Sequence, residues 1–463
     1  MVPFKHSSAL QLVTFLALAS SAVAAPPAKN ADRYWPQWRG PNCNGVALKA
    51  NPPTEWSEEK NIRWKVEIPG AGHATPIIWG DRVYIQTAVK TEKTADHAGK
   101  KDESAGFFQP QPGRRRRPGG GFNRQQEKPR EIHEFQVLAL DRTTGKTVWT
   151  TTVCEEVPHE AGHGDSTQAS NSPVTDGKHI YAYFGSRGLY CLDTKGKVKW
   201  KKDFGQMQTR NEFGEGSSPA LYGDVLVVSW DHEGDDFVIA LDKRTGDELW
   251  KVERDEPTSW CTPLVLEVNG KPQVITSATN FIRAYDLKNG KEIWRCKGMT
   301  MNTIPSPVAG KGLVYCISGF RGNALLAIRY GAAKGDITDT DAIAWKHDKD
   351  TPYVPSALLY NDVLYFLDNN RAILSAFDAR SGEALYGKQR LEGLDMIYAS
   401  PVGASNRVYI AGRNGKTIVL RHGAKFQVLA TNTLDDGFDA SPAIAGDELF
   451  LRGRKHLYCI AAE

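Results

Sequence analysis

The 463-residue sequence contains no Cys-x-x-Cys pair, which argues against a covalently attached haem and a four-thiolate zinc site. It also lacks a serine or cysteine nucleophile motif, a phosphate-binding loop and a recognisable nucleic-acid module. The formal net charge of +4 is small for this length, so charge gives no reason to expect a nucleic-acid partner. These absences remove several common classes of enzyme and binding protein from consideration.

Cysteine is scarce and follows no pairing pattern. The seven cysteines are an odd number, and their spacing shows no disulfide framework. Cys191, Cys316 and Cys459 lie inside apolar strand patterns. We therefore expect these three to be buried thiols that pack as small hydrophobic side chains.

Long hydrophobic runs are confined to the N-terminus. Lys5 and His6 precede an apolar run from Ala9 to Leu18, and Ala22-Val23-Ala24 follows as a small-residue cleavage site. This pattern predicts a secretory signal peptide over residues 1–24, too short to span a membrane. No other stretch approaches a transmembrane length, and no cysteine stands directly after the cleavage site. We expect a periplasmic or secreted protein without a lipid anchor.

What the sequence does contain is a repeated hairpin, clearest at Phe237 to Trp250 (FVIALDKRTGDELW). An apolar strand runs to Leu241, turn residues follow from Asp242 to Gly246, and a returning strand ends on Trp250. Clear copies of this hairpin end on Trp149, Trp200 and Trp294. A stretched copy ends on Trp345, one ends on Tyr386, and a copy near Gly423 has lost both Asp and Trp.

A second marker, a small hydroxyl residue next to proline, opens a strand ahead of each hairpin. From Ser172 onward the markers are 46, 44, 44, 50, 44 and 41 residues apart. Repeats of this length with four strands each are typical of propeller blades. The markers are Thr75-Pro76, Ser172-Pro173, Ser218-Pro219, Thr262-Pro263, Ser306-Pro307, Pro355-Ser356 (inverted), Ser400-Pro401 and Ser441-Pro442.

The last repeat lacks a fourth strand, which the segment Ile62 to Ile68 has the character to supply. Such closure removes exposed strand edges. We therefore predict an all-β fold: an eight-bladed β-propeller of four-stranded antiparallel blades over residues 62–463, closed by an N-terminal strand in the C-terminal blade. Seven blades are the alternative if the marker at Ser441 only extends the seventh repeat.

Two segments fall outside the repeat. Residues 25–61, rich in Trp and Pro, are expected to lie against the propeller as an anchor segment. Residues 90–131 hold eleven Lys/Arg against six Asp/Glu with few apolar residues, which predicts a flexible basic insertion. Two interpretations stay open for the insertion, a solvated loop and a docking loop for anionic polymers or lipid headgroups.

With the Ala-x-Asp-x-x-x-Gly-x-x-x-Trp hairpins, the Ser-Pro strand openings and the leader in hand, the chain resembles the PQQ-like β-propeller repeat proteins. It looks closest to their exported, BamB-like branch. The resemblance covers the chain from about Tyr34 to the end. The family includes binding platforms and enzymes that use pyrroloquinoline quinone (PQQ) with Ca²⁺. Those enzymes place a disulfide between adjacent cysteines against the cofactor, and no two cysteines are adjacent here.

In a propeller blade the connections from fourth to first strand and from second to third strand emerge on one face, and here these connections are the longer ones. We therefore expect the functional face there. His159, Glu160 and His163 lie in the connection between the first two blades, and Asp231, His232 and Glu233 lie in a connection of the third. Such side chains can ligate zinc, copper or Ca²⁺, so a joint metal site is one hypothesis; loop-stabilising or solvated side chains are the alternative.

Further polar and aromatic residues fall in the same set of connections and could line a funnel over the central channel. Such a mouth suits a sugar, a peptide or a flat cofactor, although each residue can equally serve to cap its own loop. The candidate ligand-binding residues are Arg187, Trp260, Asn280, Arg321, Tyr353, Asn370, Tyr398 and Arg413.

The leading interpretation is an exported, monomeric, non-catalytic scaffold of the cell envelope that binds a protein, peptide or carbohydrate. The alternatives are a dehydrogenase that depends on PQQ and Ca²⁺, and a carbohydrate-binding propeller. No motif residues support a particular cofactor, and we expect neither a nucleic-acid partner nor a transmembrane segment.

Overall fold

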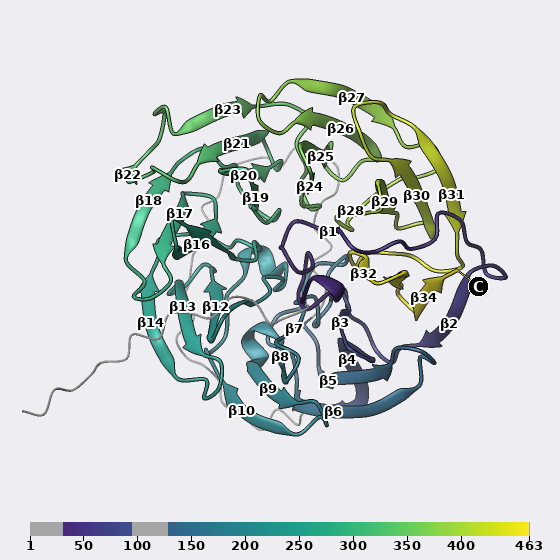
Figure 1. Ribbon diagram of the computed structural model, residues 1–463. Helices are drawn as coiled ribbons and strands as arrows, with labels where there is room; N and C mark the ends of the chain where they lie inside the picture. The colour runs from purple at the N-terminus through teal and green to yellow at the C-terminus, as the bar shows by residue number, and fades with distance from the viewer. Residues whose placement is uncertain (1–30, 95–127, 463) are drawn as a thin grey trace, which may run out of the picture.

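A computed structural model describes residues 31–94 and 128–462 of the chain. In these residues the chain forms eight antiparallel sheets around a central axis, like the blades of a propeller (Figure 1). Among the described residues helix is limited to three 3₁₀ turns, η1 (Ala31–Arg33), η2 (Gly185–Arg187) and η3 (Arg210–Glu212). The predicted signal peptide lies outside the described residues, as does most of the basic insertion.

The blades follow one another in chain order, and each contributes its first strand to the centre of the ring, where neighbouring first strands contact one another. Blade 1 consists of β3 (Ile77–Trp79), β4 (Arg82–Thr94), β5 (Glu131–Asp141) and β6 (Thr147–Glu156). Blade 2 consists of β7 (Val174–Thr175), β8 (His179–Tyr183), β9 (Leu189–Asp193) and β10 (Val198–Lys202). Blade 3 consists of β11 (Ala220–Tyr222), β12 (Val225–Trp230), β13 (Phe237–Asp242) and β14 (Glu248–Glu253). Blade 4 consists of β15 (Leu264–Val268), β16 (Lys271–Ser277), β17 (Ile282–Asp286) and β18 (Glu292–Cys296).

The second half of the ring repeats the same order. Blade 5 consists of β19 (Val308–Gly310), β20 (Leu313–Ser318), β21 (Ala324–Arg329) and β23 (Ile343–His347). Blade 6 consists of β24 (Leu358–Tyr360), β25 (Val363–Leu367), β26 (Ile373–Asp378) and β27 (Ala384–Arg390). Blade 7 consists of β28 (Val402–Ala404), β29 (Arg407–Ala411), β30 (Lys416–Arg421) and β31 (Val428–Thr433). Blade 8 consists of β32 (Ala443–Ala445), β33 (Glu448–Arg452), β34 (His456–Ala461) and β2 (Ile62–Glu67).

The closure predicted from the sequence is confirmed. Strand β2 pairs antiparallel with β34, with Trp64 opposite Cys459 and Lys65 opposite Tyr458, so both ends of the propeller meet in blade 8. Eight blades, and not seven, therefore form the ring. Two short strands add to it: β1 (Val46–Ala47) pairs parallel with β28, and β22 (Gly335–Asp336) pairs parallel with β18.

The tryptophan of the hairpin motif joins one blade to the next. Five of these indoles lie against the turn glycine of the following blade, where a Cβ atom would come within 2.5 to 2.8 Å of the ring. Each of the five glycines has a φ between 72° and 83°, so the turn and the contact both require glycine. Each indole also donates a hydrogen bond to a backbone carbonyl of that turn: Trp64 to Arg142, Trp149 to Thr194, Trp200 to Lys243, Trp250 to Leu287 and Trp345 to Ala379, at 2.7 to 3.1 Å.

Trp294 is the exception, because blade 5 has no matching turn. The insert between β21 and β23 replaces the turn, and its strand β22 places Gly335 opposite Trp294. Ala333 and Ile337 from the insert pack into the same hydrophobic cluster, and Trp294 is fully buried. The long insert in the fifth repeat therefore serves as a cover for this indole.

The hydroxyl residue of each strand-opening marker belongs to a ring of hydrogen bonds around the central channel. Seven backbone N–H groups each donate to the hydroxyl of the next blade at 2.8 to 3.0 Å, and the hydroxyl of Thr75 closes the ring on the carbonyl of Ser441 at 3.0 Å. The markers therefore bond each blade to its neighbour at the axis. In blade 6 the inverted order Pro355-Ser356 still places a serine in the ring. The members are Thr75, Ser172, Ser218, Thr262, Ser306, Ser356, Ser400 and Ser441.

Replacing one member of this ring is expected to destabilise the fold. Ser218→Ala leaves the buried backbone N–H of Ser172 without its acceptor, which costs about 1–3 kcal/mol. Urea unfolding followed by tryptophan fluorescence measures the change. The exposed Ser381→Ala variant is the control, because its hydroxyl bonds only within its own turn; equal stability of the two variants would show that the ring contributes little.

The N-terminal segment lies across one end of the central channel (purple in Figure 1). Trp35 is fully buried and exchanges two backbone hydrogen bonds with Ile78 of blade 1. The guanidinium of Arg39 donates to the carbonyls of Pro401 (2.7 Å) and Ala357 (2.8 Å), next to the hydroxyl ring. Further along, Asn51 donates to Gly446 in a turn between first and second strands. The segment thus closes the channel at the end where the first strands finish.

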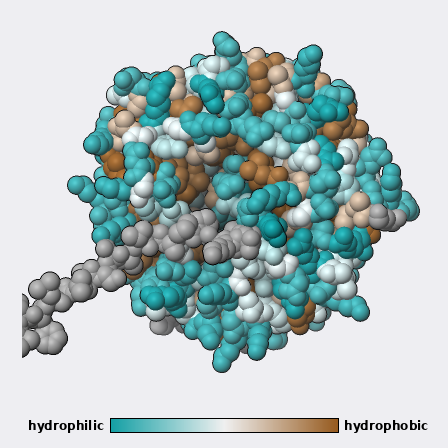
Figure 2. Space-filling model, viewed as in Figure 1, coloured by the Kyte–Doolittle hydropathy of each residue, from teal (hydrophilic) through white to brown (hydrophobic). Residues whose placement is uncertain are grey.

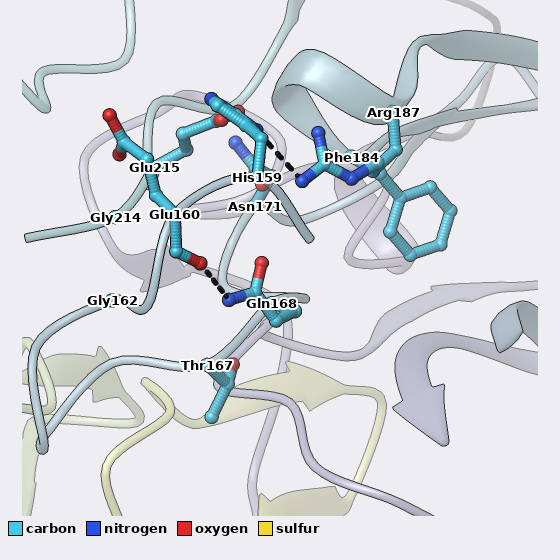
Figure 3. A pocket seen from close by; sticks show the side chains of 10 residues that line it. All are labelled: His159, Glu160, Gly162, Thr167, Gln168, Asn171, Phe184, Arg187, Gly214 and Glu215. Carbon is cyan, nitrogen blue, oxygen red and sulfur yellow. Dashed lines mark hydrogen bonds between the residues drawn. The ribbon is translucent and has the colours of Figure 1, made fainter. Parts of the chain in front are cut away.

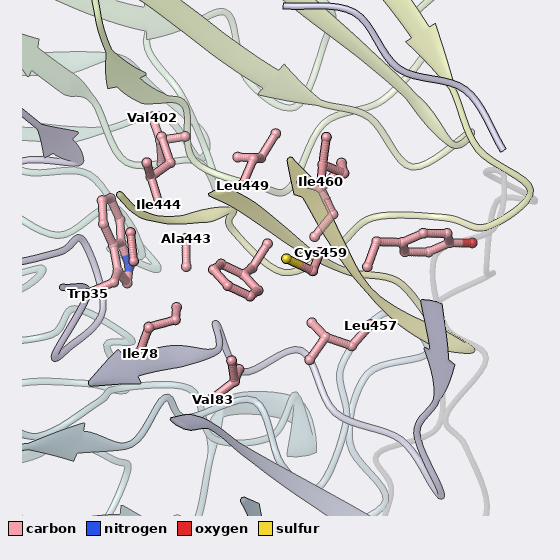
Figure 4. Close-up of a cluster of buried hydrophobic side chains, with 14 of the residues drawn as sticks. Trp35, Ile78, Val83, Val402, Ala443, Ile444, Leu449, Leu457, Cys459 and Ile460 are labelled. Carbon is pink, nitrogen blue, oxygen red and sulfur yellow. The ribbon is translucent and has the colours of Figure 1, made fainter. Parts of the chain in front are cut away.

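Hydrophobic packing is concentrated between the blades. The cluster in Figure 4 joins Trp35 and Ile78 to Ile444, Leu449 and Leu457 of blade 8, so the N-terminal segment shares a core with the closing blade. All seven cysteines are free, and those expected to be buried are buried. In the view of Figure 2 the surface is mostly hydrophilic, with hydrophobic residues in separate patches. No helix in the described part of the chain is long and apolar enough to cross a membrane.

Candidate functional site

The two faces of the ring differ in what covers them. We call the face with the connections from second to third strand, and from each blade to the next, the top face. The bottom face holds the short turns and the N-terminal segment. Every candidate residue named from the sequence lies in a connection of the top face, but the structure divides these residues among several local networks.

His159 and Arg187 come together at the junction of blades 1 and 2 (Figure 3). Arg187 belongs to η2 and donates from Nη2 to Nδ1 of His159 at 2.9 Å, while Nε2 of His159 lies 2.6 Å from the carbonyl of Met207. Glu156 pairs with Nε of Arg187 at 2.5 Å. Both nitrogens of His159 are therefore engaged in hydrogen bonds, and burial lowers its pKa.

Two carboxyl groups line the same small cavity, whose volume of about 20 Å³ is that of a water-sized space. Glu160 accepts hydrogen bonds from the backbone N–H of Thr209 (2.7 Å) and from its hydroxyl, and burial raises the pKa of Glu160. Glu215 accepts from the N–H and the hydroxyl of Ser186, both at 2.6 Å. Burial raises the pKa of Glu215 to about 7, although the hydrogen bonds and Arg187 oppose the shift.

This carboxyl group predicts a stability that depends on pH. Because the pKa of Glu215 is higher in the folded protein than its ordinary value of 4.5, the folded state binds the proton more tightly than the unfolded state does. Its contribution is present below about pH 4.5 and is lost as the pH rises through about 7. Glu215→Gln should flatten the pH dependence of the unfolding midpoint between these values; an unchanged profile would contradict the assignment.

His163 faces a different way from His159. Its Nδ1 accepts the backbone N–H of Asp165 at 3.1 Å, and its ring packs edge-on against Phe213. The two histidines of the His-x-x-x-His spacing are thus each held by separate local contacts, and the short loop between them carries Gly162 at a φ of 82°.

The second predicted metal cluster, in blade 3, is built into the loop as structural contacts. Asp231 forms a fully buried ion pair with Arg254, with 2.8 Å between Oδ1 and Nε, and accepts the hydroxyl of Ser259 at 2.5 Å. His232 accepts the backbone N–H groups of Gln208 and Gly234 at Nδ1. Glu233 accepts two hydrogen bonds from Thr258.

Within residues 31–94 and 128–462, no three His, Cys, Asp or Glu side chains are grouped so that they could hold a metal ion. The joint His/carboxylate metal site stays a prediction, since Asp231 and its neighbours already have protein partners. These partners supply the loop-stabilising role that the sequence left open as the alternative.

One network does connect distant parts of the top face. Asp165, in the connection from blade 1 to blade 2, accepts Nη2 of Arg413 at 2.7 Å and the hydroxyl of Tyr398 at 3.0 Å, both from the region of blade 7. Nε of Arg413 also pairs with Oδ1 of buried Asp439 at 2.6 Å, and its guanidinium lies 4.3 Å from the ring centre of Tyr398. Burial opposes ionisation of Asp165, but Arg413 and Tyr398 hold the pKa of Asp165 below its ordinary value.

Sequence reasoning found Arg413 and Tyr398 but missed Asp439. Asp439 stands two residues before Ser441 of the hydroxyl ring, and Tyr398 stands two residues before Ser400. His73 has the same offset from Thr75 and lies 3.6 Å from Asp439. Burial lowers the pKa of His73 to about 4, so its imidazole is neutral. This offset is a sequence signal for the residues just above the ring.

The remaining predicted residues stay apart from this network. Trp260 donates from its indole to the carbonyl of Gly214 at 2.7 Å. Asn280 donates to the carbonyl of Asp255, and Asn370 accepts the N–H of Val354. Tyr353 stacks on Phe320 with 4.8 Å between ring centres, and Arg321 lies over the same Phe320 ring. Among these, only Arg321 is exposed with no protein hydrogen bond in the described structure.

The fold has solved counterparts at low sequence identity, so they show the fold alone. BamB from Moraxella catarrhalis is 13% identical with a TM-score of 0.51, covering 70% of this chain and 91% of that chain. The quinohemoprotein alcohol dehydrogenase ADHIIG from Pseudomonas putida HK5 is 11% identical with a TM-score of 0.54, covering 92% and 80%. The computationally designed Ika8 protein is 12% identical with a TM-score of 0.51, covering 73% and 95%.

No curated protein matches the chain in sequence. Residues 133–388 match the family model described as the outer membrane protein assembly factor BamB. The match spans four complete blades, from β7 to β23, with the last two strands of blade 1 before them and most of blade 6 after them. Because it includes more than half of the chain, the protein belongs to the BamB-like family of PQQ-like β-propellers.

Proposed function

We propose that the protein is a non-catalytic scaffold of the cell envelope that binds a partner protein through the loops of its top face. The observation that carries this proposal is that the chain itself occupies the bottom end of the central channel, while the loops of the top face are joined to one another. Trp35 and Arg39 occupy the bottom end. On the top face, Asp165 reaches from the blade 1–2 connection to Arg413 of blade 7. With the bottom end closed, the loops of the top face are the surface offered to a partner.

The leader sequence supports the envelope location, and the family supports a protein partner. The matching family model describes an outer membrane protein assembly factor, and assembly requires contacts with other proteins. Long connections supported by a rigid ring are also the usual place for protein recognition.

The quinone-dependent alternative fits these residues poorly. The seven cysteines are free, so the disulfide that the quinone enzymes place against the cofactor has no counterpart. The described residues offer no group of three His, Cys, Asp or Glu ligands for the accompanying metal ion. The cavity between His159 and Glu215 is water-sized, which is too small for a three-ring quinone.

Site-specific photocrosslinking tests the proposal. A photoreactive amino acid at the exposed top-face residue Arg321 is expected to capture a specific envelope protein in the source cells. The same probe at Asp224, in a bottom-face turn, is the matched control and should capture none. Equal capture from both faces would contradict the face assignment. Saturable binding of PQQ and Ca²⁺ with dye-linked alcohol oxidation would overturn the scaffold proposal.

A further inference from the structure

A concavity in the top face lies beside blade 1. It is a groove of about 590 Å³. Strands β4 and β5 are longer than the corresponding strands of the other blades. Their extension carries Lys90 and His133 and forms one wall of the groove. The opposite wall is the loop from Ser166 to Gln168, which belongs to the connection between blades 1 and 2. The groove thus lies between blade 1 and the connection that leads to blade 2.

The rim of the groove is positively charged. Lys90, Lys128 and Arg130 line it with exposed side chains, and Glu131 is the single acidic residue of the lining. Glu131 pairs with Lys90 at 2.7 Å. Lys128 lies 3.5 Å from Glu212, a residue outside the lining. The guanidinium of Arg130 has no carboxylate partner in the part of the chain that the structure describes. His133 adds no charge near neutral pH, because burial lowers its pKa. The lining therefore carries a net positive charge.

The shape and the neutral residues of the groove narrow the choice of ligand. Gly70, Ala71 and Ala88 are small, and backbone hydrogen bonds of 2.9 and 3.0 Å between Ala71 and Ala88 hold that part of the wall in place. Ser166 and Gln168 supply neutral hydrogen-bonding groups. No Phe, Tyr or Trp is among the described lining residues, so the groove lacks the large aromatic faces on which sugars and nucleic-acid bases stack. A concave site also fits a linear chain better than the plane of a bilayer.

We propose that this groove binds an extended, acidic peptide segment of a partner protein. Carboxylates of the segment would pair with Lys90, Lys128 and Arg130, and its backbone would lie along the small residues of the wall. Such a contact gives orientation and association rate more than raw affinity, and it weakens as salt rises. The inference rests on the proposed scaffold function and adds the chemistry of the partner and the place of contact.

Fluorescence anisotropy with a labelled 12-residue peptide of alternating Glu and Ala tests the proposal on the full-length mature chain. A peptide with Gln in place of Glu is the ligand control. The variant K90E/K128E/R130E should weaken binding of the Glu peptide at least about tenfold at low salt. The matched variant K178E/K195E/K199E makes the same change in net charge on exposed lysines of blade 2 and should bind as the unmodified protein does.

Three results would overturn the groove assignment. The first is equal binding of the Glu and Gln peptides, and the second is an equal loss of affinity in the two charge-reversal variants. The third is full binding by K90E/K128E/R130E, which would assign binding to other residues, such as the basic residues 95–127 that this variant keeps. Displacement of the bound peptide by anionic vesicles or polyphosphate at lower charge concentration would assign the groove to those ligands instead. Capture of a partner at Arg321 without any peptide binding would refute this inference while leaving the scaffold function in place.

Discussion

Replacing Trp64 by alanine is expected to lower the free energy of unfolding by about 3–5 kcal/mol, the range for large aromatic side chains in cores. The indole is 7% exposed and packs against Gly145 of blade 1, where it also donates to the carbonyl of Arg142. Trp64 is the tryptophan that packs β2, the N-terminal strand of blade 8, against blade 1. Its loss therefore weakens the contact between blades at which the ring closes.

The midpoint of urea unfolding and the thermal unfolding temperature measure this effect. Leu249→Ala is a suitable control, because Leu249 is 49% exposed beside the docking residue Trp250. Limited proteolysis gives a second readout, since the weakened closure should make β2 the first strand to be cut away. A Trp64→Ala protein as stable as the control would show that β2 is held by its backbone pairing alone.

Much of the fold could be predicted because the informative contacts are local in the repeat. Within one hairpin, Asp242 and Gly246 indicate the turn and its glycine conformation, and Trp250 is the side chain that packs against the next blade. The missing fourth strand of the last repeat is equally a local observation. The role of the Ser-Pro markers was not predictable in this way, since each hydroxyl accepts its hydrogen bond from a residue about 41 to 50 positions away for most pairs.

The candidate site was harder to predict for the same physical reason. The sequence placed Arg413 and Tyr398 on one face, but their partner Asp165 is separated from Arg413 by 248 residues, and no pattern links them. Contacts between loops depend on how far each loop extends over the central axis. The repeat pattern does not encode that distance. The sequence also does not reveal that a candidate ligand has a buried protein partner, as Asp231 has in Arg254.

Removing one partner of the buried pair between Asp231 and Arg254 is expected to destabilise the protein by about 3–5 kcal/mol. The side chains are 2% and 0% exposed, respectively. Burial alone would lower the pKa of Arg254, but Asp231, with further help from Glu256 and Asp236, holds it above its ordinary value. Asp231→Leu leaves the guanidinium buried without its nearest carboxylate, and Arg254→Met leaves the carboxylate with Ser259 as its remaining side-chain donor.

The double variant Asp231→Leu/Arg254→Met should recover most of the loss, because it buries neither charge alone. Its unfolding midpoint, compared with those of the two single variants, gives the coupling energy of the pair. The same proteins also test the metal hypothesis for this loop. If Asp231 is structural, Ca²⁺ or Zn²⁺ leaves the unfolding temperature of the unmodified protein unchanged. A metal-induced rise that disappears in Asp231→Leu would instead make the carboxylate a ligand, and the loop of blade 3 would become a binding site.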